Sequence, residues 1–226
     1  MADDDPAVRD AYRRFLTDMD GSAHQEFTLV GEARNGAQAI ECYRNLLPDI
    51  VLMDLHMPGT SGVEATERIT SEWSDACVVA LTTFGTRDYI VAALHAGASG
   101  YLLKDSGGKH IVAGMRLALR GDMPLSSAVR RQLVSSVTSS DPPPQLPTNI
   151  GLTPRERELL SWLTHGLTNN QIARKMYVSE GSVKQYMSHI GTKLRVKSRT
   201  QILIRAIQLN IVDPHTLPTT TTGARS

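Results

Sequence analysis

Three side chains suited to phosphate or metal chemistry each follow a short apolar run. They are Asp54 after residues 50–53, Thr82 after residues 77–81 and Lys104 after residues 100–103. Short runs rich in β-branched residues are typical of strands buried on both faces of a parallel sheet. Parallel strands end at one edge, so these side chains are predicted to meet there. A lone Asp after a strand is usually a turn former or helix N-cap, and the agreement of three strand ends favours a site.

Asp3 and Asp4 precede a predicted helix over residues 6–16, and a loop at this position would bring them to the same edge. The alternative is a solvated acidic segment that favours a helix N-terminus. Clustered carboxylates repel one another, and a small hard cation makes such a cluster tolerable at neutral pH. Mg²⁺ fits, because it takes oxygen ligands and keeps several waters. Asp54 could then act as a nucleophile and form an aspartyl phosphate.

The elements that must position these residues alternate between strand and helix patterns. Beyond the runs above, the pattern predicts a strand over residues 29–33 and helices over residues 37–47, 63–73, 87–96 and 110–120. Such alternation indicates a doubly wound parallel α/β sheet with helices on both faces.

The net charge of +1 conceals two halves of opposite sign. Residues 1–145 carry 13 Lys and Arg against 19 Asp and Glu, whereas residues 146–226 carry 11 against 4. This division predicts two domains, of which the second binds a polyanion. Cys42 and Cys77 lie in apolar segments without a disulfide or metal spacing. No membrane span or signal peptide is visible, so a cytoplasmic protein is expected.

Residues 139–149 contain four prolines and are predicted to form a semi-rigid linker after a short helix over residues 126–137. Four helices are then predicted over residues 154–165, 169–176, 180–194 and 199–209, three of them with capping-box signals. Within the third, apolar residues recur at spacings of four, three and four from Val183 to Leu194, and the opposite face is polar. Alone this is an ordinary solvated face, but in a basic segment and after another short helix it indicates a helix-turn-helix.

Residues 3 to about 121 resemble the receiver domain of bacterial two-component response regulators. The resemblance rests on the acidic pair, LMDLHMPG, Thr82, and LLKD with its lysine 22 positions after that threonine. It implies a flavodoxin-like fold, Mg²⁺ as cofactor and the phosphohistidine of a sensor histidine kinase as donor. It also implies a role for each site residue: Asp54 as phosphoacceptor, Thr82 and Lys104 as phosphoryl-binding residues, Tyr101 as the aromatic whose packing follows Thr82, and Asp3, Asp4, Asp54 and the backbone carbonyl of His56 as metal ligands.

One departure concerns the first strand. Receivers have an apolar strand before the acidic pair, and only Met1 and Ala2 stand there in this sequence. That strand would lie between residues 29–33 and 50–53. Without it, backbone groups of both neighbouring strands would be unpaired, and each lost buried hydrogen bond costs about 1 to 3 kcal/mol. We therefore expect about five to eight further apolar residues upstream, a normal strand length. Without them, a loose or rearranged receiver and weakened metal binding through Asp3 and Asp4 are expected.

Residues 151–213 resemble the LuxR-type helix-turn-helix domain. The segments that carry this resemblance are LTPREREL, GLTNNQIA, VSEGSVKQY and KLRVKSRTQ. Joined to a receiver, this domain implies the NarL/FixJ subfamily. The resemblance places Lys184, Gln185 and Ser188 at bases or adjacent phosphates, Ser182 at the DNA backbone and the last helix in a homodimer contact. Ser188 stands where relatives are often basic, and Gly191 costs a helix interior about 1 kcal/mol.

The sequence therefore predicts a receiver over residues 1–121, a linker over 122–150, a DNA-binding domain over 151–213 and a disordered tail over 214–226. Phosphorylation of Asp54 would control dimerisation and binding to double-stranded promoter DNA. One alternative is a DNA-binding regulator controlled by a ligand or by constitutive dimerisation. Another is a phosphatase or phosphotransferase, but enzymes of the haloacid dehalogenase type carry a second Asp where this chain has His56, so no enzyme is expected.

Overall fold

A computed structural model describes residues 1–18, 27–73, 75–83, 87–125, 129 and 150–213. The chain divides into two compact units, Met1–Arg120 and Gly121–Ser226. Within the described ranges, no helix has the length and apolar character needed to cross a membrane.

In its described residues, the first unit contains a parallel sheet with the strand order β1 (Val51–Asp54), β2 (Val78–Thr82) and β3 (Gly100–Leu103). Every residue of β1 and β2 is buried, as their apolar sequences predict. The register pairs Asp54 with Leu81 and Thr82 with Leu103. Asp54 and Thr82 therefore end their strands at one edge of the sheet, and Lys104 follows β3 at that edge.

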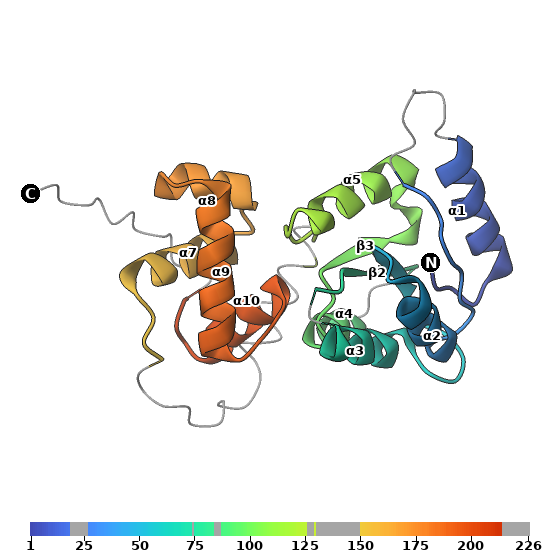
Figure 1. The fold of residues 1–226 in the computed structure, drawn as a ribbon, viewed down its shortest axis with the longest axis horizontal. Coiled ribbons are helices and arrows are strands. Elements are labelled where there is room, and N and C mark those ends of the chain that lie inside the picture. The colour runs from blue at the N-terminus through green and yellow to red at the C-terminus, as the bar shows by residue number, and fades with distance from the viewer. Residues whose placement is uncertain (19–26, 74, 84–86, 126–128, 130–149, 214–226) are drawn as a thin grey trace, which may run out of the picture. The chain divides into compact units, whose positions relative to one another are not determined.

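Helices cover both faces of this sheet, as predicted. They are α1 (Pro6–Asp18), α2 (Gly36–Leu46), α3 (Gly62–Glu72), α4 (Arg87–His95) and α5 (Gly108–Leu119), with a 3₁₀ turn, η2, over Lys104–Ser106. Side chains alternate along β1, so Val51 and Met53 pack with α2 and α3, and Leu52 packs with α1 and α5. In Figure 1 the strands accordingly lie between α1 and α5 on one side and α2, α3 and α4 on the other.

Met1–Asp3 lie between β1 and residues 31–33 and pair with both. Ala2 donates to the Leu52 carbonyl at 2.8 Å and accepts from Asp54 N–H at 2.8 Å, while Asp3 donates to the Ala33 carbonyl at 3.0 Å. The predicted strand over residues 29–33 is wrong, because only Ala33 forms a bridge, to Ala2. A strand needs a neighbouring strand as hydrogen-bond partner, and Met1–Asp3 bond to this segment only at Gly31 and Ala33.

Beyond Met1, an apolar cavity opens between residues 27–32 and the start of β1. The cavity is partly open to solvent. Next to this cavity, Asp3 keeps its backbone hydrogen bond to Ala33. Further residues upstream stay a prediction.

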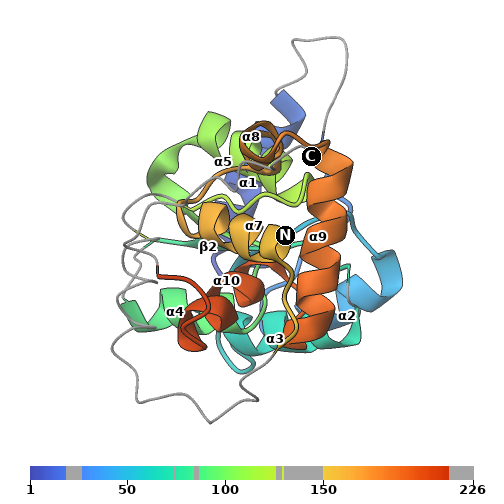
Figure 2. The same ribbon diagram turned by 90° about the vertical axis from the view of Figure 1, so that its left-hand side faces the viewer.

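Among residues 150–213, the second unit contains the helices α7 (Pro154–Thr164), α8 (Asn169–Met176), α9 (Glu180–Leu194) and α10 (Arg199–Gln208). The three predicted capping boxes are present at Thr153, Thr168 and Ser198, and Ser179 caps α9. The long helix α9 packs against the other three (Figure 2). The predicted helix over residues 126–137, apart from Val129, lies outside the described residues, as do the four prolines of residues 139–149 and the predicted tail.

Gly191 has a packing role inside α9 that the sequence does not reveal. A Cβ at this position would lie 2.8 Å from the Val196 carbonyl oxygen and 3.6 Å from Ile202 Cδ1. The Val196 N–H donates to the Gly191 carbonyl at 2.9 Å. The glycine therefore lets the chain after α9 turn closely against the helix, which explains its presence despite its low helix propensity.

Candidate functional site

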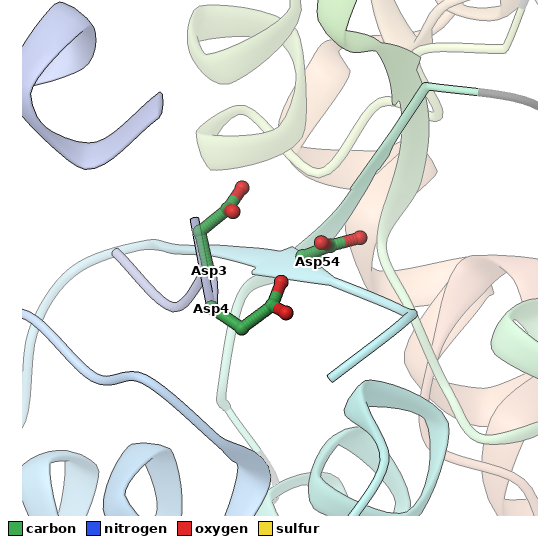
Figure 3. A group of neighbouring side chains, drawn as sticks. All are labelled: Asp3, Asp4 and Asp54. Atoms are coloured by element: carbon green, nitrogen blue, oxygen red, sulfur yellow. The ribbon is translucent and has the colours of Figure 1, made fainter. Parts of the chain in front are cut away.

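Three carboxylates meet at the carboxyl edge of the sheet (Figure 3). Asp3 and Asp4 come from the start of the chain and Asp54 from the end of β1, and their ligand oxygens all lie within 4.8 Å of one another. Asp3 is fully buried and Asp54 is 4% exposed, whereas Asp4 is exposed. The cluster thus has a buried floor and one side that faces solvent.

Lys104 places its ammonium between the two buried carboxylates. Its Nζ lies 2.7 Å from Asp3 Oδ2 and 2.8 Å from Asp54 Oδ2. Burial acts to lower the pKa of Lys104, but the hydrogen bonds and charges of Asp3 and Asp54 raise it overall. The pKa of Asp3 is raised, because burial outweighs the opposing effect of Lys104. The lysine is therefore charged and already neutralises part of the cluster.

Backbone groups hold the carboxylates in place. His56 N–H donates to Asp54 Oδ1 at 3.2 Å, and Asp5 N–H donates to Asp3 Oδ1 at 3.1 Å. A Cβ on Gly62 would lie 1.8 Å from the Asp54 carbonyl oxygen. Gly62 is thus required by the close approach of α3 to the end of β1. The sequence offered only the glycine-rich MPGTSG turn as a signal for it.

Arg9 is a second residue that the sequence analysis missed. Its Nη1 donates to the Asp3 carbonyl at 2.7 Å and to the Asp4 carbonyl at 3.1 Å, and its Nε lies 3.6 Å from Glu32. Arg9 is only 8% exposed, which is low for an arginine. It fixes the backbone of the acidic pair from the first turn of α1. An arginine so soon after an acidic run was the available signal.

Thr82 ends β2, and Tyr101 lies on the neighbouring strand β3, where the register pairs it with Ala80. Thr82 is 1% exposed and Tyr101 is 2% exposed. Burial raises the pKa of Tyr101 to about 12, an effect that the Thr82 hydroxyl opposes and the charge of Asp54 reinforces. The tyrosine side chain is therefore buried, near enough to Thr82 and Asp54 for both to affect its pKa.

The donor set fits a divalent cation of the Mg²⁺ type. Its side-chain donors are carboxylate oxygens, the ligands that hard cations prefer. Three carboxylates and one ammonium leave a formal charge of −2, which one divalent cation balances. The structure therefore brings together the predicted Asp3, Asp4, Asp54 and Lys104, while the role of the His56 carbonyl stays a prediction.

In the second unit, the predicted DNA-facing residues lie on the outer side of α9. Lys184, Gln185 and Ser188 are exposed, and Ser182 is half-buried with its hydroxyl 2.9 Å from that of Ser179. On the opposite side, Val183, Ile190 and Leu194 are buried. The helix thus offers a polar surface on a fixed apolar base.

Lys193 also lies on α9, but its side chain is bound to other residues of the second unit. Its Nζ lies 2.7 Å from Glu156 Oε2 and 2.9 Å from the Gly151 carbonyl oxygen. Glu156 is the acid of the α7 capping box, so Lys193 ties α9 to the start of α7. This basic residue has a structural partner that its sequence position did not indicate.

Both units match known families. Residues 1–116 match the response regulator receiver domain, and residues 151–206 match the bacterial regulatory proteins of the luxR family. The chain is a response regulator of the NarL/FixJ subfamily.

Relatives match this response regulator over nearly their whole length. The transcriptional regulatory protein LnrK of Bacillus subtilis is 37% identical over 93% of this chain and 96% of its own. The nitrate/nitrite response regulator protein NarL of Escherichia coli K12 is 33% identical over 90% of this chain and 92% of its own. A LuxR-family response regulator structure from Aurantimonas is 31% identical with a TM-score of 0.53, and it covers 61% of this chain and 95% of its own.

These matches join the two sites in one kind of protein. A receiver with an aspartate cluster precedes a LuxR-type helix-turn-helix domain, so this chain is a DNA-binding response regulator. Control by a ligand or by constitutive dimerisation is not favoured. The family consists of transcriptional regulators, and the absence of enzymatic activity stays a prediction.

Proposed function

We propose that Asp54 accepts a phosphoryl group from the phosphohistidine of a sensor histidine kinase, and that this event controls dimerisation and promoter binding. The observation that carries the proposal is the position of Lys104, whose ammonium lies 2.8 Å from Asp54 Oδ2 and 2.7 Å from Asp3 Oδ2. This contact supports the proposal, because a fixed positive charge beside Asp54 would stabilise the oxygens of an incoming phosphoryl group.

In the transfer, a carboxylate oxygen of Asp54 attacks the phosphorus atom and forms an acyl phosphate. The phosphorus–nitrogen bond of the donor breaks, and the imidazole leaves with its electron pair. Lys104 and the Thr82 hydroxyl bind the phosphoryl oxygens in this proposal, and Tyr101 packs toward Thr82 as its inward position allows. The His56 N–H keeps Asp54 oriented, as its 3.2 Å contact with Oδ1 supports.

Mg²⁺ is the cofactor of this proposal. Asp3, Asp4, Asp54 and the backbone carbonyl of His56 would hold it, and it would supply charge neutralisation for the transferred group. Arg9 and Asp5 N–H prepare the acidic pair for this role through their hydrogen bonds to it.

In this proposal, the output of the regulator is the binding of a homodimer to double-stranded promoter DNA. Lys184 and Gln185 would reach base edges or phosphates, with Ser188 beside them, and Ser182 would contact the DNA backbone. The helix α10 would pair two copies. In this structure every side chain of α10 is buried or half-buried, with Ile204 and Ile207 each 4% exposed. A protein with these partners acts in the cytoplasm.

Sedimentation velocity tests the switch. The full chain is measured with Mg²⁺ alone and with Mg²⁺ and beryllofluoride, which mimics a phosphoryl group on aspartate, and Asp54→Asn serves as the matched control. We expect a shift from monomer to dimer that the control lacks. Equal behaviour of both proteins with a cooperative melt would reject phosphorylation at Asp54 and favour control by a ligand or by constitutive dimerisation.

A further inference from the structure

A buried polar cluster joins the chain just after the receiver unit to the helix-turn-helix. Asp122 is 7% exposed, and its Oδ1 accepts the main-chain N–H of Asn169 at 2.6 Å, across 47 positions of sequence. Asn169 is the first residue of α8. The carboxylate thus binds one of the helix N–H groups that have no partner within α8, while Thr168 caps another.

Arg199, the first residue of α10, is the counter-charge in this cluster. Its Nη1 lies 3.9 Å from Asp122 Oδ1 and donates to the Asn169 side-chain oxygen, and its Nη2 donates to the Leu167 carbonyl at 2.5 Å. Burial lowers the pKa of Arg199 to about 10, and the charge of Asp122 opposes this shift. One carboxylate therefore serves both the start of α8 and the start of α10.

The position of Asp122 in the chain gives this cluster a further consequence. The receiver unit ends at Arg120, so only Gly121 separates it from Asp122. If Asp122 were free, the connection to the DNA-binding helices would instead run to Gly151, and a flexible chain of about 30 residues has a reach of about 30 Å. A short connection gives a much higher effective concentration than a long one.

We propose that Asp122 is a positioning residue that fixes the chain leaving the receiver to the α8–α10 junction, so that receiver dimerisation acts on the DNA-binding helices through a short connection. Residues 122–150 are then not a free tether along their whole length. This inference rests on the proposed phospho-switch for its effect on DNA binding, but not for the contact itself.

Amide hydrogen exchange of the full chain tests the contact. In Asp122→Ala we expect the Asn169 amide to exchange at least tenfold faster, while buried amides of α9 such as that of Ile190 keep their rates. Asp122→Asn retains an acceptor without the charge and should give a smaller increase. An unchanged Asn169 rate, or equal acceleration throughout α7–α10, would overturn the proposal.

DNA binding tests the coupling, which a merely structural role would not change. The probe is a duplex selected from a random-sequence library with the wild-type chain in Mg²⁺ and beryllofluoride. We expect the gain in affinity on addition of beryllofluoride to fall at least fivefold in Asp122→Ala. The control is Asp49→Ala, because Asp49 is exposed and lies in the receiver. A wild-type gain that Asp122→Ala retains would refute the positioning role alone. No gain in the wild-type chain would refute the phospho-switch, and the coupling with it.

Discussion

The acidic edge and the outer side of helix α9 are assembled in opposite ways. The edge takes Asp3, Asp54 and Lys104 from three distant parts of the sequence and holds them within ion-pair distance. The residues on the outer side of α9 all come from one helix, Glu180–Leu194. Its N-terminus is capped by the adjacent Ser179. Substitutions at the edge should therefore disturb a whole unit, whereas those on the outer side of α9 should act locally.

The largest effect is expected for Lys104→Met in magnesium-free buffer. Removal of the ammonium leaves two buried carboxylates without a counter-charge, so the unfolding free energy of the first unit should fall by about 4 kcal/mol. The chain has two tryptophans, and in a Trp162→Phe background Trp73 alone reports on this unit in urea denaturation. Added Mg²⁺ should restore part of the loss.

Lys109→Met is the control for that experiment, because Lys109 is exposed. Its unfolding midpoint should match that of the parent protein. If Lys104→Met behaved the same way, the ion pairs would contribute nothing to stability.

Gly62→Ala should destabilise the same unit by about 3 kcal/mol, because the added Cβ would lie 1.8 Å from a backbone oxygen of Asp54. Gly59→Ala is the matched variant, since Gly59 has a φ of +74° and no atom within 4 Å of an added Cβ. It should cost only about 1 kcal/mol, from the backbone conformation alone. Equal losses in the two variants would show that the close approach of α3 is relaxed in solution.

In the second unit, Glu156→Gln should cost about 1.5 kcal/mol at pH 7, since it weakens a capping box and the contact with Lys193. Burial acts to raise the pKa of Glu156, but Lys193 and Thr153 lower it overall. Such a carboxyl contributes stability that is complete above its unfolded value of 4.5 and is lost as the pH falls through its folded pKa. The difference between the wild type and Glu156→Gln should therefore shrink below pH 4.5, as Trp162 fluorescence in a Trp73→Phe background would measure.

The smallest effect is expected for Lys184→Ala on the exposed side of α9. The fold should be unchanged, and affinity for the selected duplex should fall about fivefold, with a salt dependence weaker by about one ion. Fluorescence anisotropy at several salt concentrations measures both quantities, with Lys109→Ala as the control. A loss of thermal stability in Lys184→Ala would contradict the view that this side of α9 acts locally.

Local sequence signals were enough to predict most of the secondary structure. The limits of β3, α8 and α9 agree with the predicted residues, because short apolar runs and helix N-caps act within a few positions. Parallel topology also placed Asp54, Thr82 and Lys104 at one edge, since parallel strands can only end there together.

Pairing and close approach were decided by tertiary structure. Residues 29–33 have a strand-like sequence, but a strand forms only where a neighbour offers hydrogen bonds, and Met1–Asp3 offer them as far as Gly31. Gly62 and Gly191 look like ordinary helix glycines until the chain that passes within 3 Å of each is known.

The sequence by itself determined which residues could do chemistry and on which kind of element each would lie, because residue type and period are local properties. Only the tertiary structure decided that Lys104 neutralises Asp3 and Asp54, that Arg9 holds the acidic backbone and that Asp122 joins Arg199. These contacts join residues far apart in sequence, and their energies come from burial and charge that exist only once the chain has folded.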